Sequence, residues 1–277
     1  MVALKDLLRK KLSEIELAHL RASFDSVGSI AILEISDALR KKEKFIAKAI
    51  LDENPAIKTV LKKVGKHYGE YRAQKTKFLV GEKTKEAIHK ENGVLMKLNV
   101  ETCYFSPRLS TERMRVAQLV QPNEDILVMF SGIAPYPLIL AKHSFAKKIV
   151  GIEKNPVAHK YALENLKLNK ISAQKIILFK SDVRKKVPLL KQKFDRIIMP
   201  LPKIGSEFLD VAFKAVKKGG VIHLYQFADE ALFNVLSKKI LNTCSSFKKK
   251  CKILGVFKAG QHAPRNYRVR VDIKLIN

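Results

Sequence analysis

Short apolar runs alternate with helix-type patterns through the C-terminal two thirds of the chain. The runs cover residues 126–130, 149–152, 176–179, 196–199 and 221–227, and apolar residues at helical spacing fill 161–170, 208–216 and 230–241. Runs of this length that alternate with helices are typical of a parallel sheet with helices on its faces. Two alternating apolar runs, 252–257 and 267–275, end the chain and predict an antiparallel hairpin on that sheet.

The first hundred residues carry a mixed pattern. Apolar spacing predicts helices over 3–20 and 44–51 and strands over 30–35 and 71–80. The segment 64–69, with a glycine at each end of its polar centre, is expected to be flexible. Asn92-Gly93 separates two strand-like runs, and Asn-Gly at such a place is a strong signal for a type I′ hairpin. These features predict a compact α+β accessory domain with basic strands.

A charged, proline-containing segment separates the two patterns. We predict an accessory domain over 1–103, a linker over 104–115 and a larger α/β domain over 116–277. Arg108, Glu112 and Arg113 crowd charge into the linker. Chemistry is expected where two such domains meet, because clefts between domains are preferred ligand sites.

Small residues and acids follow three consecutive strand-like runs. The first run ends in Phe130-Ser131-Gly132, the second ends in Glu153, and the third is followed by Asp182. If the sheet is parallel, these residues meet at one edge. Glycine there lets the backbone approach a ligand closely, and a carboxylate can accept both ribose hydroxyls. The order predicts an adenosine-plus-ribose site.

Each of these residues also has an ordinary structural interpretation. A full G-x-G-x-x-G is absent, so a dinucleotide pyrophosphate has no evident cradle. Gly132 could be a plain strand-to-helix turn, Glu153 a solvated acid at a helix start, and Asp182 a helix N-cap. The ordered set of acid after acid at successive strand ends favours the ligand interpretation.

Positive charge dominates the composition. The chain has 277 residues with 54 Lys and Arg against 26 Asp and Glu, which gives a net charge of +28. A polyanionic partner such as RNA explains this best, because lysine and arginine neutralise phosphates and release counterions. The alternative is a lysine-rich proteome or a hot or salty habitat, which would spread lysine without such a meaning.

The cysteines and the longest apolar runs narrow the setting of the protein. Cys103, Cys244 and Cys251 show neither metal-ligand spacing nor a disulfide framework, although Cys244 and Cys251 could form a bridge. No apolar run reaches the ~18 residues of a membrane helix, and the N-terminal pattern is amphipathic instead of that of a signal peptide. We expect a soluble cytoplasmic protein with no membrane partner and no metal.

Several motifs in the same order resemble one family. They are YFSPRLSTERMRVA (104–117), FSGIAP (130–135), IEKNP (152–156), YALENLKLNK (161–170), SDVR (181–184), DRIIMPLPK (195–203), GGVIHLYQF (219–227) and, in the accessory domain, HKENG (89–93). Together they are similar to the archaeal and eukaryotic tRNA guanine N1-methyltransferases, which modify guanosine 37 next to the anticodon. The resemblance runs from about residue 23 to the end and includes the final hairpin typical of class I methyltransferases that use S-adenosyl-L-methionine (AdoMet).

The resemblance implies a fold and a partner. The fold is a class I AdoMet-dependent, Rossmann-like methyltransferase domain of α/β class, preceded by a smaller α+β RNA-binding domain. The partner is the anticodon stem-loop of tRNA, and a monomer is expected. Two departures stand out. The N-terminal residues leave no room for the separate domain with which many members bind the tRNA elbow, and Pro200 stands where many members have asparagine.

The resemblance also implies catalytic roles. Glu112 is the candidate base for the proton on guanine N1, Arg72 approaches O6, and Arg108 and Arg113 hold the substrate. These roles suit the chemistry, because N1 is a poor nucleophile until its proton leaves, and its loss places negative charge on O6. A carboxylate at N1 and a guanidinium at O6 address both parts of the barrier.

The remaining site residues follow from the same resemblance. Glu153 is expected to bind the ribose diol, Asp182 the adenine edge, and the turn after the first run the methionine moiety. The implied cofactor-binding set is Phe130, Ser131, Gly132, Ile133, Glu153, Lys154, Asp182, Val183 and Pro200. The substrate set adds Pro200, Leu201 and Pro202 to Arg108 and Arg113.

Other interpretations of single residues stay open. Arg72 could be one more phosphate-binding strand residue, and Glu112 could simply pair with Arg108 or Arg115 along a helix. His89 is expected to pack or bind phosphate instead of catalysing. Tyr225 and Phe227 are expected to belong to the core.

Other functions also stay open. Methylation of carbon 7 of the wyosine intermediate imG-14 at the same nucleotide is the main alternative, alone or in addition, and Pro200 bears on it because proline donates no hydrogen bond. Transfer of an aminocarboxypropyl group from AdoMet fits the motifs less well. A non-catalytic RNA-binding protein with a vestigial cofactor fold is the alternative of another class.

Overall fold

The chain forms two compact units, Met1–Pro107 and Arg108–Asn277, in the computed structural model, which describes residues 4–9, 11–21 and 23–277. The division falls inside the segment 104–115 that the sequence assigns to a linker. Each unit has a hydrophobic core of its own.

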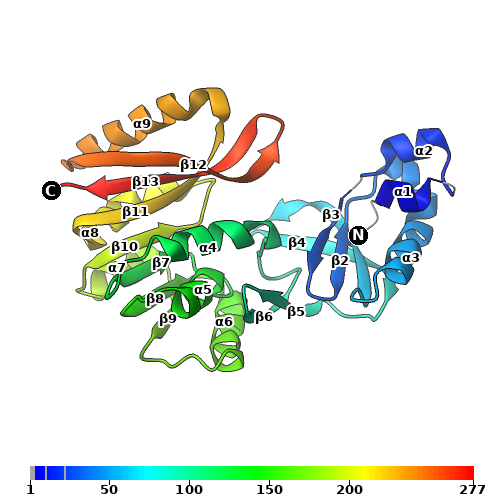
Figure 1. Ribbon diagram of the computed structural model, residues 1–277, viewed down its shortest axis with the longest axis horizontal. Helices are drawn as coiled ribbons and strands as arrows, with labels where there is room; N and C mark the ends of the chain where they lie inside the picture. Colours follow the sequence, from blue (N-terminus) through cyan, green and yellow to red (C-terminus); the bar gives the residue numbers. More distant parts are fainter. Residues whose placement is uncertain (1–3, 10, 22) are drawn as a thin grey trace. The chain divides into compact units, whose positions relative to one another are not determined.

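The N-terminal unit is built on a four-stranded sheet (Figure 1). Its strands, in spatial order, are β1 (Asp25–Val27), β2 (Ile30–Leu33), β3 (Thr59–Tyr68) and β4 (Ala73–Gly81). Its helices are α1 (Leu4–Leu8), α2 (Glu14–His19), η1 (Asp37–Lys42) and α3 (Glu43–Glu53). Ile46 and Ile50 of α3 share a buried cluster with Val60 and Leu79 of the sheet, and burial of such side chains drives the helix onto the sheet.

The single helix predicted over 3–20 is wrong. The described residues of this stretch form α1 and α2, and residues 3 and 10 lie outside the described part. Ser13 and Glu16 start the second helix, since each side chain accepts a hydrogen bond from the other residue's N–H, at 3.3 and 2.9 Å. This reciprocal capping box starts α2 as a separate helix, although the apolar spacing of the sequence continues through it.

Segment 64–69, which the sequence did not assign to a strand, lies mostly in β3, whose register with β4 shifts between Val64 and Tyr68. The side chains of these last β3 residues are exposed, so they lack the apolar alternation that marks a half-buried strand. The predicted hairpin is confirmed: β5 (Glu86–Glu91) pairs with β6 (Val94–Asn99). Asn92 and Gly93 have φ of 45° and 73°, and a type I′ turn requires both to be positive.

The C-terminal unit contains a seven-stranded sheet in the order β12-β13-β11-β10-β7-β8-β9 (Figure 1). The strands are β7 (Asp125–Met129), β8 (Lys148–Glu153), β9 (Ile176–Lys180), β10 (Phe194–Met199), β11 (Val216–Asp229), β12 (Cys251–Ala263) and β13 (Asn266–Leu275). Within the group β7 to β11, all neighbouring strands are parallel. Strand β13 is antiparallel to both β11 and β12. This confirms the predicted parallel sheet with a final antiparallel hairpin.

Helices precede and connect the strands of this sheet. η2 (Pro107–Leu109) and α4 (Ser110–Gln118) come before β7. The parallel strands are connected by α5 (Pro135–His143), α6 (Pro156–Leu168), α7 (Val183–Leu189), η3 (Gly205–Phe208) and α8 (Leu209–Ala215), and η4 (Glu230–Leu232) and α9 (Phe233–Ser246) lead from β11 to β12. Strand β11 begins earlier than predicted, because α8 ends at Ala215 and the strand runs through Gly219, where φ is 77°. Its register with β10 shifts between Phe194 and Arg196.

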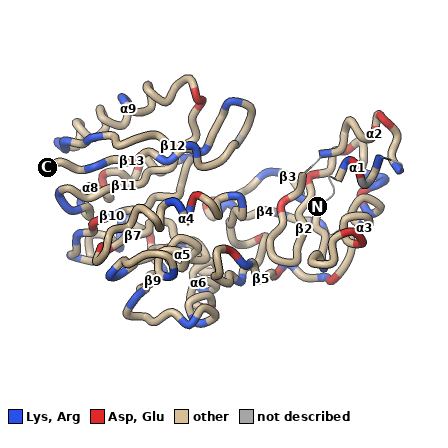
Figure 2. The backbone as a smooth tube through the Cα atoms, viewed as in Figure 1, with Lys and Arg blue, Asp and Glu red and all other residues tan. Residues whose placement is uncertain are grey.

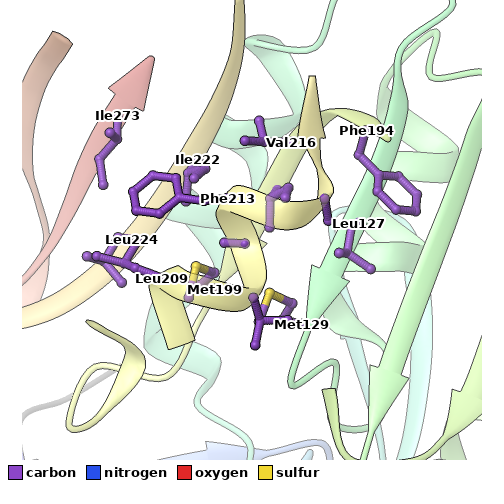
Figure 3. Close-up of a cluster of buried hydrophobic side chains, with 14 of the residues drawn as sticks. Leu127, Met129, Phe194, Met199, Leu209, Phe213, Val216, Ile222, Leu224 and Ile273 are labelled. Atoms are coloured by element: carbon purple, nitrogen blue, oxygen red, sulfur yellow. The ribbon is translucent and has the colours of Figure 1, made fainter. Parts of the chain in front are cut away.

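Alternate residues of the central strands form the core of this unit. Figure 3 shows Leu127 and Met129 of β7, Met199 of β10 and Leu224 of β11 beside Leu209 and Phe213 of α8, and Leu127, Met129, Met199, Leu209 and Leu224 have no exposed surface. Full burial of one such side chain contributes about 1.5–3 kcal/mol. The core therefore fixes the carboxyl ends of β7 and β10, which are neighbours in space although β8 follows β7 in the chain. In open α/β sheets ligands bind where the strand order reverses in this way.

Candidate active site

The turn after β7 is strained and closely tied to β8. Phe130, Gly132 and Ala134 have φ of 57°, 57° and 70°, and only glycine adopts this region without cost. Ser131 N–H donates to the carbonyl of Ile152 at 2.9 Å. Strained non-glycine residues of this kind persist where the surroundings hold them and are common at ligand sites.

Glu153, at the end of β8, holds this turn through its carboxylate. Oε2 accepts from the Gly132 N–H and Oε1 from the Asn155 N–H, both at 2.7 Å. Burial raises the pKa of Glu153, and hydrogen bonds from the backbone of Asn155, Gly132 and Lys154 oppose the rise. A carboxylate has about four lone-pair sites, so Glu153 can hold this turn and still accept from a ribose hydroxyl.

Asp182 is a helix N-cap, as its ordinary interpretation proposes. Its side chain accepts from the Arg184 N–H at 2.8 Å at the start of α7, and its Oδ2 lies 3.3 Å from Lys154 Nζ. Val183 is buried in the core. The cap fixes the direction of the carboxylate at the end of β9, next to the end of β8. The structure thus brings the acids of two successive strands to one sheet edge.

A buried hydroxyl in the same place lacks a protein partner. Ser131 is 4% exposed, and its Oγ has no hydrogen bond. It lies against Gly151 of β8, where an added Cβ would come within 3.2 Å of Ser131 Oγ and 2.6 Å of Leu178 Cδ2. Buried polar atoms rarely stay unpaired in the working state of a protein. The strained turn, the anchored carboxylate and this hydroxyl fit an adenosine-type cofactor.

The loop after β10 borders the same turn. Pro200 and Leu201 are half-buried and Pro202 is buried. The loop is tied down by Leu201 N–H donating to the Met199 carbonyl at 2.9 Å. Phe208, further along, meets the ring of Phe130 edge to face at 4.9 Å between centroids. Ile133, the last residue of the predicted cofactor turn, is fully buried.

Glu112 lies on α4 and is only 2% exposed. Its Oε1 accepts two hydrogen bonds, from Tyr225 Oη and from a terminal nitrogen of Arg270, both at 2.7 Å. Its Oε2 is buried without a hydrogen bond, and Arg115 lies 3.7 Å from it. The helical pairing with Arg115 is therefore present, but the short contacts come from β11 and β13.

Tyr225 was expected to be a core residue. It is buried, and its hydroxyl also makes two hydrogen bonds. It is 1% exposed, and its hydroxyl donates to Glu112 and accepts from Tyr136 Oη of α5 at 2.7 Å. Burial raises the pKa of both phenols, so both remain protonated at neutral pH. Phe227, the other expected core residue, is half-buried with the Arg268 guanidinium 5.6 Å from its ring.

The two arginines predicted to hold substrate flank Glu112 in the chain. Arg108 lies in η2 and is exposed, whereas Arg113 of α4 is 2% exposed and among the largest fully buried side chains. The structure thus places a buried guanidinium on the same helix as the candidate base.

Arg72 belongs to the N-terminal unit and sits in the turn before β4. Its φ is 54°, and its guanidinium lies 4.0 Å from the centroid of the Tyr104 ring. His67 meets the same ring edge-on at 5.4 Å and donates from Nδ1 to the Arg72 carbonyl at 3.0 Å. The Nε of Arg72 is buried without a hydrogen bond. The contact with Tyr104 restricts the position of this guanidinium. An arginine that only binds phosphate from an exposed strand surface would not need such a contact.

His89 is a packing residue. Its Nδ1 accepts from the Gly28 N–H at 3.2 Å, and its ring meets Phe105 edge-on at 5.2 Å. Gly28 is required there, because its φ is 55° and an added Cβ would lie 2.4 Å from the Ile88 carbonyl oxygen. The structural interpretation of this histidine is confirmed.

Other features of the described residues complete the setting. Lys and Arg lie along both units (Figure 2). Cys103, Cys244 and Cys251 are free thiols, so the bridge left open by the sequence is absent. Within the described ranges, no three His, Cys, Asp or Glu side chains gather as a metal site would require, and no helix is long and apolar enough to span a bilayer.

Comparison with known proteins gives a consistent result. The TRM5/TYW2 methyltransferase domain matches residues 87–254, and the TYW2 N-terminal domain matches 4–84. The tRNA (guanine(37)-N(1))-methyltransferase Trm5b of Pyrococcus abyssi is 39% identical over 92% of this chain and 76% of its own. The tRNA (guanine(37)-N(1))/4-demethylwyosine(37)-methyltransferase Taw22 of Nanoarchaeum equitans is 35% identical over 92% of this chain and 100% of its own.

A solved structure agrees with this match. Trm5 of Methanocaldococcus jannaschii in complex with adenosine superposes with a TM-score of 0.81 at 32% identity, over 100% of this chain and 79% of that one. Fold, domain models and relatives all agree with the family expected from the sequence motifs. The chain therefore belongs to the TRM5/TYW2 methyltransferase family.

Proposed function

We propose that this protein transfers a methyl group from AdoMet to N1 of guanosine 37 in tRNA and so forms 1-methylguanosine. The observation that carries the proposal is Glu112, a buried carboxylate held by Oε1 while Oε2 keeps its hydrogen-bonding capacity. Relatives that match most of the chain carry this activity in their names.

Proton removal from N1 is the step the protein must assist. Glu112 Oε2 accepts the N1 proton as the N1–H bond breaks, and the electron pair left on N1 forms the new bond to the methyl carbon. When bound, AdoMet would supply the methyl group from a sulfonium centre, with a neutral thioether as the leaving group. Negative charge that develops on O6 is stabilised by Arg72, whose guanidinium is already fixed on Tyr104.

The cofactor residues take the roles that the family resemblance implies. Glu153 accepts from the ribose diol, because its carboxylate has more lone-pair sites than the backbone N–H groups around it occupy. Asp182 and Lys154 contact the adenine side, Val183 supplies apolar surface, and the 130–133 turn contacts the methionine moiety. Arg108 and Arg113 orient the nucleotide, and the net charge of +28 attracts the tRNA backbone.

Methylation of carbon 7 of the wyosine intermediate at the same nucleotide is the second candidate. Pro200 favours it, since a proline ring cannot donate the hydrogen bond with which an amide would read the guanine edge. The Nanoarchaeum equitans relative, matched over its full length, combines both activities in its name.

Product identification tests both candidates. Labelled AdoMet is incubated with a tRNA transcript that carries guanosine 37, and in parallel with tRNA that carries the wyosine intermediate, followed by nucleoside mass spectrometry. 1-Methylguanosine from the first substrate supports the main proposal. A methylated product from the second substrate alone would replace it with the wyosine activity.

Two further outcomes would contradict both. A mass gain equal to an aminocarboxypropyl group would indicate the other transfer chemistry, and failure to bind AdoMet would indicate a non-catalytic RNA-binding protein. Pro200→Asn provides the matched variant: we expect it to raise the ratio of guanosine to wyosine-intermediate methylation, because it restores an amide at that position.

A further inference from the structure

Glu112 is one end of a continuous row of buried polar side chains. Arg270 bridges Glu112 and Asp272, because its Nε donates to Asp272 Oδ1 at 2.8 Å while a terminal nitrogen donates to Glu112. Asp272 also accepts from His223 at 2.6 Å. Each of these residues is at most 4% exposed.

The row of polar side chains continues from His223 to Arg196 and Glu124. Arg196 donates to His223 Nε2 at 2.6 Å and binds Glu124 through two nitrogens at 2.7 and 2.8 Å. Since arginine has no acceptor, His223 must carry its proton on Nδ1 and donate it to Asp272. Negative and positive groups therefore alternate from Glu124 to Glu112, with a neutral imidazole between them.

Strand register explains why these groups meet. Tyr225 lies opposite Arg270, and His223 lies opposite Asp272, in the antiparallel pair of β11 and β13. Residues two apart on a strand point to the same face, so all four side chains share one side of the sheet. Glu112 from α4 and Tyr136 from α5 meet that side.

From this geometry we propose that Tyr225 and Arg270 are positioning residues that hold Glu112 by Oε1 and leave Oε2 as the proton acceptor. The inference rests on the proposed role of Glu112 as base. Both donors act on one oxygen, which restricts rotation of the carboxylate and selects one proton-accepting atom.

Several polar groups face Glu112. Tyr225 donates a hydrogen bond to it, and Arg270 and Arg115 place guanidinium nitrogens 2.7 and 3.7 Å from its carboxylate oxygens. Asp272 is held by Arg270 and His223. Burial lowers the pKa of Arg270, and Asp272 and Glu112 outweigh that effect and raise it, so the cation persists.

The test is the pH dependence of single-turnover methyl transfer at saturating tRNA and AdoMet. In Tyr225→Phe the carboxylate loses one donor, so the acidic limb of the profile should move to higher pH. Near neutral pH the rate should fall about tenfold, recover in alkaline buffer, and leave both KM values unchanged. Arg270→Lys keeps the charge but loses the bridge and should shift the limb in the same direction.

Two variants keep the test decisive. Tyr136→Phe removes a donor to Tyr225 but none to Glu112, so its limb should move less. Tyr225→Phe also leaves the Tyr136 hydroxyl without its acceptor and could therefore fold poorly. The double variant Tyr136→Phe/Tyr225→Phe removes both hydroxyls, so no phenol is left unpaired. It should show the same shift of the acidic limb as Tyr225→Phe. An equal loss at every pH, or an unmoved limb, would overturn the positioning role.

Glu112→Gln is measured beside them to separate the two proposals. If Glu112→Gln transfers methyl groups at the wild-type rate, both the base and its positioning fail. If Glu112→Gln is inactive and the Tyr225→Phe profile is unmoved, only the positioning fails.

Discussion

Strands β11 and β13 present two faces of opposite character. On one face Ile222, Leu224, Val271 and Ile273 are fully buried and belong to the hydrophobic core. On the other face, the intervening residues are His223, Tyr225, Arg270 and Asp272, which are buried almost as deeply. The same two strands thus hold the fold together on one side and a charged network on the other.

The difference shows how a buried charge is tolerated. An apolar face needs only volume and shape, so modest changes there cost modest amounts. A buried polar face is stable only when each charge has its partner. If one partner is removed, the other ion stays buried, and no attraction offsets the free-energy cost of its desolvation. The four polar residues therefore behave as one unit with Glu112 and Arg196.

Asp272→Ala should have the largest effect on stability. It removes one of the two carboxylates that bind Arg270 and leaves His223 without an acceptor, so the free energy of unfolding should fall by about 3–5 kcal/mol. Urea denaturation measures the change, with Asp272→Asn as the matched variant that keeps an acceptor. A loss below about 1 kcal/mol, as for an exposed pair, would contradict the account of this face.

The second largest effect on stability is expected from acidification, which acts on the same polar face. Burial lowers the pKa of His223, although Asp272 opposes the shift, so the unfolded chain binds a proton below about pH 6.5 that the folded protein rejects. The pKa of Asp272 is also lowered, by His223 and Arg270 against the effect of burial, so its contribution is lost at still lower pH. From His223 alone the unfolding free energy should fall by up to about 1.4 kcal/mol per pH unit.

The control for that prediction is His223→Gln, which should flatten the slope between pH 6.5 and the acid transition, a window set by the ordinary histidine value of about 6.5. A stability that rises on acidification would mean that the folded imidazole is the better proton binder.

Ile222→Val tests the apolar face and should have a smaller effect. The side chain is fully buried, so loss of one methylene should cost about 0.5–1.5 kcal/mol. Methyl transfer per folded molecule should not change, because this side of β11 does not contact Glu112. A clear loss of transfer rate without a loss of stability would show that the two faces are not independent.

Lys217→Gln should have the smallest effect. Lys217 pairs with Asp195 at 2.8 Å near the start of β11, but its side chain is 41% exposed. Partly exposed pairs contribute about 0–1 kcal/mol and are screened by salt. Equal unfolding free energies at low and high salt in the variant, against a small difference in the wild type, would distinguish this surface pair from the buried network.

Much of the fold could be predicted because its signals are local. Alternating apolar runs and helical stretches indicate the parallel sheet, and Asn92-Gly93 indicates the separate hairpin of β5 and β6. One helix was predicted over 3–20, where a capping box starts a second helix within one continuous apolar pattern. The exposed end of β3 was not predicted, because it lacks apolar alternation.

The candidate site was predicted only in part, because its contacts are not local. Glu153 and Asp182 follow strands, and Glu112 follows from the family motif, so each has a signal near it in the chain. Tyr225 and Arg270 have none that joins them to Glu112. A polar residue at every second position of 222–225 and 270–273 does indicate a polar face, but only the register of β11 with β13 brings the two segments together.

The central claim is that Glu112 removes the N1 proton. Its most direct test is the single-turnover rate of methyl transfer to guanosine 37 in Glu112→Gln, compared with Glu230→Gln, whose side chain is exposed on η4. The account predicts that Glu112→Gln is slower by about 10²–10⁴-fold with AdoMet binding retained, and that Glu230→Gln equals the wild type. Equal rates for the two variants would contradict it.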